Sequence, residues 1–164
     1  DIRIMVNWLA TKGDLILHAS GLIFDNRGYC FIGDSGAGKS TIIRALAGEK
    51  GVKVLGEDQV ILRYLNGEFW IFGTPWHEAP EYVSPDGARL RKIFFLNRQF
   101  NEVIRSIEPG AGVNKILQTA FMPYYLPDKI GNIIDRLGTL AQAVPFFELH
   151  YQLGSSILPQ ILNL

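Results

Sequence analysis

A glycine-rich octapeptide, GDSGAGKS at residues 33–40, limits the folds that this chain can adopt. It matches the pattern G-x-x-x-x-G-K-S/T, in which successive backbone N–H groups surround phosphate oxygens. An apolar run at 29–32 precedes it, and apolar residues at helical spacing follow it until Gly48. A turn that joins a strand to a helix places a bound phosphate at the positive end of the helix dipole. The motif therefore predicts an α/β fold that binds a nucleoside triphosphate, ATP by expectation, together with Mg²⁺.

The residues of this loop have separate expected roles. The glycines let the backbone turn inward, the Lys39 amine reaches the β- and γ-phosphates, and the Ser40 hydroxyl is a ligand for Mg²⁺. The predicted nucleotide-binding residues are Gly33, Asp34, Ser35, Gly36, Ala37, Gly38, Lys39, Ser40 and Thr41.

Two adjacent acidic residues, Glu57 and Asp58, follow the next apolar run at 52–55. P-loop proteins place a carboxylate at about this position to hold the metal. One of the two would bind Mg²⁺, and the other would accept the proton of an attacking hydroxyl group. The pattern leaves open which carboxylate takes which role, and the alternative is a solvated strand end. Both are predicted as catalytic residues and, with Ser40, as metal ligands.

The sequence around the loop predicts hairpins instead of alternating strands and helices. Residues 15–24 favour a strand that turns at 25–28, and the runs 59–65 and 68–72 flank Asn66-Gly67, a strong hairpin signal. Another strand is expected at 92–96. We therefore predict an α/β fold with the P-loop in a mixed, largely antiparallel sheet.

Helices are expected after this sheet. Apolar spacing predicts one over 114–122 and a second after Pro127, with Asp128 as its cap and Pro145 at its end. A strand at 146–151 and a short helix from Ser155 or Ser156 complete the expectation.

Composition limits the class of protein. With 164 residues, 48% of them apolar, the chain is expected to form a single domain over 1–164. Sixteen basic residues balance sixteen acidic ones, so no overall positive field favours nucleic acid or an anionic membrane surface. The single cysteine, Cys30, suits a reducing cytoplasm and is expected to be buried. Because the sequence begins with Asp1, we expect the domain to be the C-terminal part of a longer protein.

The arrangement of His18-Ala19-Ser20, the loop, and Glu57-Asp58 before a hairpin resembles the catalytic domain of bacterial HPr kinase/phosphorylase. That family has a phosphoenolpyruvate-carboxykinase-like fold, and its histidine precedes the loop at about this separation. The resemblance covers roughly residues 17–72. The chain has Glu57-Asp58 where the family has paired aspartates, and it lacks the family's later Glu-Arg-Gly signature. Residues 72–77 and 89–96 look more like divergent HPr-kinase-like proteins, some of which phosphorylate serines of peptides.

The resemblance implies a kinase that transfers the γ-phosphoryl group to a hydroxyl, with serine in a protein or peptide as the expected acceptor. It adds His18 as the residue that orients or charges the acidic pair, and it implies a ring-like homo-oligomer. A nucleotide-dependent switch with little transfer and a small-molecule hydroxyl kinase are the alternatives. His77 is a weak further candidate, Arg89, Arg91 and Lys92 are candidate cations for the transition state, and His150 is expected to be structural.

Overall fold

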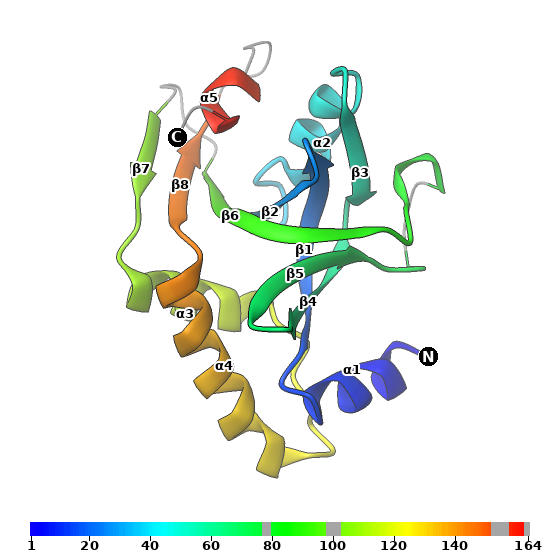
Figure 1. Cartoon of the computed structure of the whole chain (residues 1–164), viewed down its shortest axis with the longest axis vertical. Helices are drawn as coiled ribbons and strands as arrows, with labels where there is room; N and C mark the ends of the chain where they lie inside the picture. Colours follow the sequence, from blue (N-terminus) through cyan, green and yellow to red (C-terminus); the bar gives the residue numbers. More distant parts are fainter. Residues whose placement is uncertain (77–79, 98–102, 152–157, 163–164) are drawn as a thin grey trace.

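The computed structural model describes residues 1–76, 80–97, 103–151 and 158–162, without the side chains of Pro80, Leu158 and Leu162. Figure 1 shows a mixed α/β fold with a curved sheet between helices. Its elements in chain order are α1 (Ile2–Ala10), β1 (Leu15–Phe24), β2 (Arg27–Ile32), α2 (Lys39–Ala47), β3 (Val52–Gly56), β4 (Gln59–Leu65), β5 (Glu68–Gly73), η1 (Pro80–Tyr82), β6 (Gly87–Asn97), β7 (Val103–Ser106), α3 (Pro109–Thr119), η2 (Pro127–Lys129), α4 (Ile130–Ala143), β8 (Phe146–His150) and α5 (Leu158–Leu162).

The sheet is mixed and mostly antiparallel, as predicted. Strand β1 pairs antiparallel with β2, β3 and β4, and β5 pairs antiparallel with β4 and β6. Only β2–β6 and β6–β8 are parallel among the described pairings. The pairings β1–β2–β6–β5–β4–β1 form a closed circuit, so the sheet curls back on itself. Strand β3 lies beside β1, and the antiparallel pair β7–β8 extends β6.

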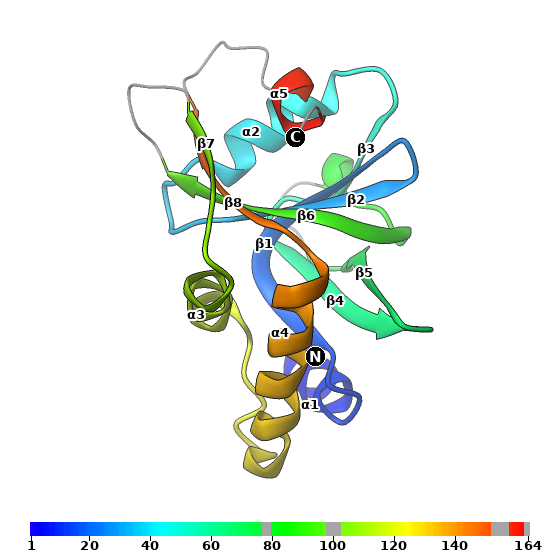
Figure 2. The same ribbon diagram turned by 60° about the vertical axis from the view of Figure 1, so that its left-hand side comes forward.

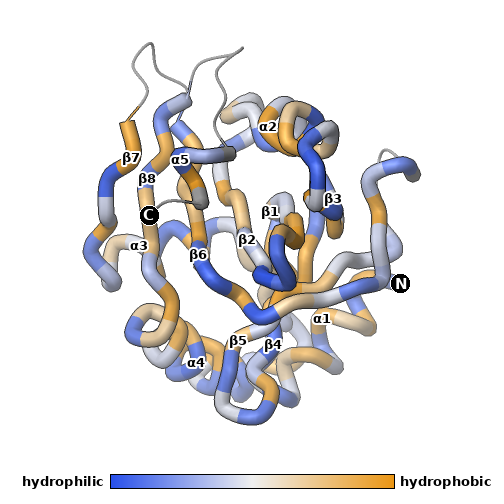
Figure 3. The backbone as a smooth tube through the Cα atoms, turned by 45° about the horizontal axis from the view of Figure 1, so that its top comes forward, coloured by the Kyte–Doolittle hydropathy of each residue, from blue (hydrophilic) through white to orange (hydrophobic). Residues whose placement is uncertain are grey.

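Both faces of the sheet are buried. In β2, Cys30 and Ile32 face one hydrophobic core, while Tyr29 and Phe31 face a second core that includes residues of α2. This alternation follows from the two-residue repeat of a strand. Helices α3 and α4 cover the first face, and α2 and α5 lie at the other (Figure 2). Figure 3 shows hydrophobic stretches along the central strands and hydrophilic residues at many of the connecting turns.

The turn residues explain why the predicted hairpins form. Asp25 and Asn26 between β1 and β2, and Asn66 and Gly67 between β4 and β5, all have positive φ, which these residue types tolerate best. Cys30 is buried, as expected, and burial raises the pKa of its thiol above the ordinary value.

Three helix boundaries, both ends of α3 and the start of α4, differ from the prediction. Helix α3 starts at Pro109 instead of 114, because the Glu108 carboxylate accepts a hydrogen bond from the Gly110 N–H (2.9 Å) and proline suits the first helical turn. It ends at Thr119, since Ala120 is extended and bridges Leu17 in β1. Asp128 does not cap α4. It lies within the 3₁₀ turn η2, which starts at Pro127 and leads directly into α4.

Three further elements complete the comparison. Helix α1 and strand β7 were not predicted, and α1 packs Val6 and Leu9 against Ile16 of β1. The short C-terminal helix is α5, while Ser155 and Ser156 lie outside the described residues. Within the described ranges, the helices are too short or too polar to cross a bilayer.

Candidate active site

The glycine-rich loop joins β2 to α2, as the sequence predicts. Phe31 at the end of β2 and Ile42 and Ile43 in the first turns of α2 are buried in the same core, which fixes the strand end relative to the helix start. The N–H of Ala37 donates to the Asp34 carbonyl (3.0 Å), which closes a turn inside the loop. The N-terminus of α2 therefore faces the space that the loop surrounds.

Two glycines of the loop have left-handed backbone conformations. Gly36 has φ +82° and Gly38 has φ +95°, values that favour glycine. They differ in their surroundings. A Cβ at Gly36 would meet no atom within 4 Å, whereas a Cβ at Gly38 would overlap the Tyr151 hydroxyl group. Position 38 therefore requires glycine both for its backbone conformation and for its packing against Tyr151.

The Lys39 side chain folds back over the loop. Its Nζ donates to the carbonyl oxygens of Gly33 (2.7 Å) and Asp34 (3.3 Å). Burial lowers the pKa of this amine, and the charges of Asp58 and Asp34 act in the opposite direction. The amine is therefore held inside the loop by two carbonyl groups that a stronger anionic partner would displace.

Strand β1 fixes the position of the acidic pair between β3 and β4. The Ser20 hydroxyl donates to the backbone carbonyl of Glu57 (2.6 Å), and the Ala19 N–H donates to that of Asp58 (3.0 Å). His18 lies one residue earlier on the same strand, and its Nδ1 lies 3.0 Å from Oδ1 of Asp58. One strand therefore positions both the acidic turn and the histidine beside it.

The His18–Asp58 pair is open to solvent. The His18 side chain is 41% exposed and that of Asp58 is 28% exposed. A carboxylate with one oxygen held by a neighbouring imidazole and part of its surface accessible can accept a proton from an incoming group. The structure confirms that these two residues are brought together.

Glu57 lies in a different environment. Its side chain is 2% exposed, and neither carboxylate oxygen has a hydrogen-bond partner among the described residues. The nearest cationic group is Nη2 of Arg44, at 3.6 Å from Oε2. An unsatisfied buried carboxylate is unfavourable unless a cation compensates it. These oxygens fit the ligand chemistry of Mg²⁺, which binds through few protein carboxylates plus phosphate and water oxygens.

These groups converge on one hollow of about 370 Å³, which we call the loop hollow. It is lined by His18, Ser35, Gly36, Gly38, Lys39, Ser40, Thr41, Glu57 and Asp58. Of the predicted nucleotide-binding residues, Gly33 and Asp34 line an adjoining hollow, and Ala37 packs against the second core. Within the described residues, no cluster of three or more His, Cys, Asp or Glu side chains forms a complete metal site. Phosphate oxygens and the Ser40 hydroxyl would have to supply further ligands.

The other candidates do not line the loop hollow. Arg89 pairs with Glu68 (3.0 Å), and the Lys92 amine donates to the Ile161 carbonyl (3.0 Å), so both interact elsewhere. Arg91 lines a separate hollow with Arg89. His150 is buried beside Glu148, with 3.3 Å between Nε2 and Oε2, which fits its expected structural role. His77 lies outside the described residues.

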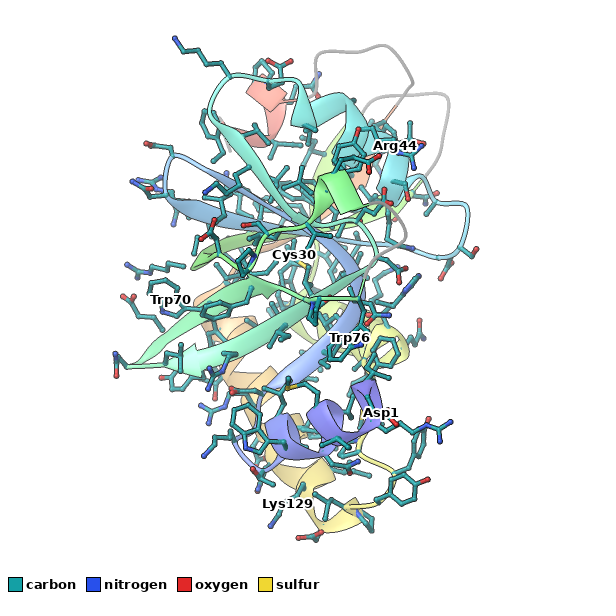
Figure 4. The ribbon with its side chains drawn as sticks, turned by 90° about the vertical axis from the view of Figure 1, so that its right-hand side faces the viewer. Asp1, Cys30, Arg44, Trp70, Trp76 and Lys129 are labelled. Atoms are coloured by element: carbon teal, nitrogen blue, oxygen red, sulfur yellow. The ribbon has the colours of Figure 1, made fainter. Side chains whose placement is uncertain are left out.

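Two residues at the site were not predicted. Arg44 lies on α2 one turn after Ser40, a spacing that could have indicated it. Figure 4 labels it on the side of the molecule away from α1. Tyr151 follows β8, and its hydroxyl donates to the carbonyl oxygens of Ala37 (3.2 Å) and Gly38 (2.8 Å). No local sequence signal connects Tyr151 to a loop more than a hundred residues earlier.

Comparisons with known proteins give a distant structural likeness. No protein-family model matches the chain, and no curated protein matches it. Among solved structures, the chain is similar to the HPr(Ser) kinase/phosphatase from Coxiella burnetii, with 16% identity over 89% of this chain and 85% of that chain and a TM-score of 0.47. A likeness at this level carries no argument about activity.

Proposed function

We propose that this protein is an ATP- and Mg²⁺-dependent kinase that transfers the γ-phosphoryl group to a hydroxyl, with a serine of a protein or peptide as the acceptor. The observation that carries the proposal is the convergence of three parts on the loop hollow: the glycine-rich loop with Lys39, the buried Glu57 carboxylate, whose oxygens accept no hydrogen bond from the described residues, and the His18–Asp58 pair. Phosphoryl transfer needs positioning and charge stabilisation above all, and these parts supply both.

The loop would bind the triphosphate. Backbone N–H groups at the start of α2 and the positive end of its dipole attract phosphate oxygens. The Lys39 amine would exchange the Gly33 and Asp34 carbonyls for the β- and γ-phosphates, which are stronger acceptors because they are charged. The same exchange would keep the amine protonated.

The environments of the two carboxylates support a division of roles that the sequence leaves open. Glu57 is buried without a hydrogen-bond partner among the described residues, so it would hold Mg²⁺ together with the Ser40 hydroxyl. When bound, Mg²⁺ neutralises charge that develops on the phosphate oxygens. Asp58 is more exposed and pairs with His18, so it would serve as the base.

The acceptor oxygen forms a bond to the γ-phosphorus, and the bond between this phosphorus and the β–γ bridging oxygen breaks, so that ADP leaves with the electron pair. The acceptor proton moves to the Asp58 carboxylate. His18 Nδ1, at 3.0 Å from Oδ1 of Asp58, would fix the orientation of the carboxylate.

Calorimetric titration of MgATP into wild type and Lys39→Ala, followed by transfer of labelled phosphate to serine peptides, tests this proposal. We expect wild type to bind MgATP and Lys39→Ala to bind it at least tenfold more weakly. This is roughly the effect of losing one charge-assisted contact. We expect transfer to disappear in Asp58→Asn while binding persists. Binding without transfer to peptides or small alcohols would indicate a nucleotide switch instead. Transfer to small alcohols alone would indicate a small-molecule kinase.

A further inference from the structure

We infer that the acceptor is a polypeptide segment in extended conformation, which carries an apolar, preferably aromatic, side chain a few residues from the phosphorylated hydroxyl. This inference rests on the proposed function and names where its substrate binds. It comes from two hollows that lead away from the His18–Asp58 pair.

The first of these, the bridging hollow, adjoins the loop hollow and shares His18 and Ser35 with it. Its far side is formed by the end of α3 and the residues that follow, including Thr119, Ala120 and Phe121. When the acceptor hydroxyl lies at Asp58, the rest of the acceptor molecule can therefore extend over this segment.

The second, the aromatic hollow, shares Ala120 and Phe121 with the bridging hollow and has a volume of about 540 Å³. Ile2 and Val6 of α1 line it together with Tyr124 and Tyr125. In Figure 4, α1, which begins at the labelled Asp1, lies beside the pale yellow segment after α3. The loop, bridging and aromatic hollows therefore adjoin one another in this order, and we call this series of hollows the path.

The position of this path is fixed by β1. The Phe121 N–H donates to the Ile16 carbonyl (2.9 Å), and Leu17 forms an isolated antiparallel bridge with Ala120. Ile16 lies two residues before His18 on the same strand, a separation of about 7 Å. An extended peptide covers this separation in about two residues, and a few more residues would reach past Phe121 into the aromatic hollow. A small alcohol is too short to reach both.

The walls of the aromatic hollow indicate the chemistry of the bound side chain. Tyr124 is 85% exposed and Tyr125 is 74% exposed, although large aromatic side chains usually bury most of their surface. Tyrosine is enriched where protein interfaces bind most strongly, and its ring attracts other aromatic rings, so these two residues suit an apolar or aromatic side chain. Arg3 also lines the hollow, and its guanidinium forms no ion pair within the described residues. An acidic residue next to the apolar residue of the bound peptide would therefore pair with Arg3.

The test uses synthetic peptides with one serine in a neutral polar background. A phenylalanine is moved one position at a time along each side of the serine, and KM and kcat are measured with MgATP. We expect one position, about three to six residues from the serine, to lower KM about tenfold relative to the matched asparagine peptide. The preference for phenylalanine is the ratio of the KM values of the asparagine and phenylalanine peptides, measured with one enzyme form. A general loss of activity therefore cancels in this ratio.

Variants then locate the effect. Tyr124→Ala/Tyr125→Ala is expected to reduce this ratio to about one, whereas Ile134→Ala, which removes an exposed apolar side chain on α4, is expected to preserve it. Serine phosphorylation with no preferred phenylalanine position, or a preference that survives the double substitution, would overturn the inference and leave the proposed function standing. Absence of transfer to every serine peptide would overturn both.

Discussion

The Tyr151 hydroxyl lies 2.8 Å from the carbonyl oxygen of Gly38, although the two residues are 113 positions apart in the sequence. The same hydroxyl reaches the carbonyl of Ala37. Gly38 is the N-terminal cap of α2 and has a left-handed conformation. The residue that follows β8, a strand paired between β6 and β7, therefore holds the part of the phosphate loop that leads into α2.

Removing this hydroxyl is expected to loosen the loop. Tyr151→Phe should lower the free energy of unfolding by about 1 kcal/mol, because it removes the only phenolic donor to these two carbonyls in the described structure. It should also weaken MgATP binding several-fold, since the loop N–H groups lose their fixed direction. Calorimetry and urea unfolding measure the two effects. The control is Tyr64→Phe, which removes a hydroxyl distant from the loop and should leave MgATP affinity at the wild-type value. An unchanged MgATP affinity in Tyr151→Phe would contradict the role assigned to the Tyr151 hydroxyl.

Alanine substitutions at two loop glycines should separate backbone strain from steric overlap. Gly36→Ala and Gly38→Ala both place a side chain at positive φ, which costs about 1–2 kcal/mol of stability. Only Gly38→Ala also meets Tyr151, so its loss of MgATP affinity should exceed that of Gly36→Ala by about tenfold or more. Adding Tyr151→Phe to Gly38→Ala should recover part of the difference. Equal losses in the two single variants would show that Tyr151 does not restrict this position.

Glu57→Gln should have opposite effects on stability and activity. The substitution removes a buried charge whose oxygens have no hydrogen-bond partner among the described residues. The Arg44 guanidinium, 3.6 Å away, is 58% exposed and stays solvated without the carboxylate, so the free energy of unfolding should rise by about 1 kcal/mol. Transfer should fall, and the Mg²⁺ concentration needed for half-maximal rate should increase. Glu49→Gln, at an exposed position after α2, is the control. A less stable Glu57→Gln protein with normal Mg²⁺ dependence would identify Glu57 as structural.

Nucleotide binding is expected to be coupled to protonation of Lys39. Burial lowers the pKa of its amine, and bound phosphates would raise that pKa again. At pH values between the lowered pKa and the pKa of the complex, binding should take up a proton, so affinity should fall as pH rises through this range. Calorimetric titrations in two buffers of different ionisation enthalpy measure the uptake. Lys39→Arg, whose guanidinium keeps its proton, should show none, and equal heats for wild type in both buffers would contradict the coupling.

The sequence predicts the central part of this structure because its signals are local. The strand at 15–24, the hairpin around Asn66-Gly67 and the helix that starts at Lys39 each depend on neighbouring residues, and all three form as expected. From the order of these elements, the sequence also predicts that Glu57 and Asp58 lie near the loop, and both line the loop hollow in the structure.

The parts that the sequence did not predict depend on distant contacts. Helix α3 begins with a Pro-Gly-Ala-Gly segment that has low helix propensity, and Gly112 is needed there because the Phe146 ring of β8 occupies the space of a side chain. Tyr151 reaches the loop only once β8 has paired with β6. The exposure that distinguishes Asp58 from Glu57 likewise arises from the packing of the whole site.

The most direct test of the central claim is transfer of labelled γ-phosphate from MgATP to a pool of serine peptides by wild type, Asp58→Asn and Asp135→Asn, with MgATP affinity measured for each. Asp135 is an exposed carboxylate on α4, distant from the loop hollow. We predict transfer by wild type and Asp135→Asn and a loss of about a hundredfold or more in Asp58→Asn at unchanged affinity. Equal transfer by all three proteins would show that Asp58 is not the base, and binding without any transfer by wild type would contradict the assignment as a kinase.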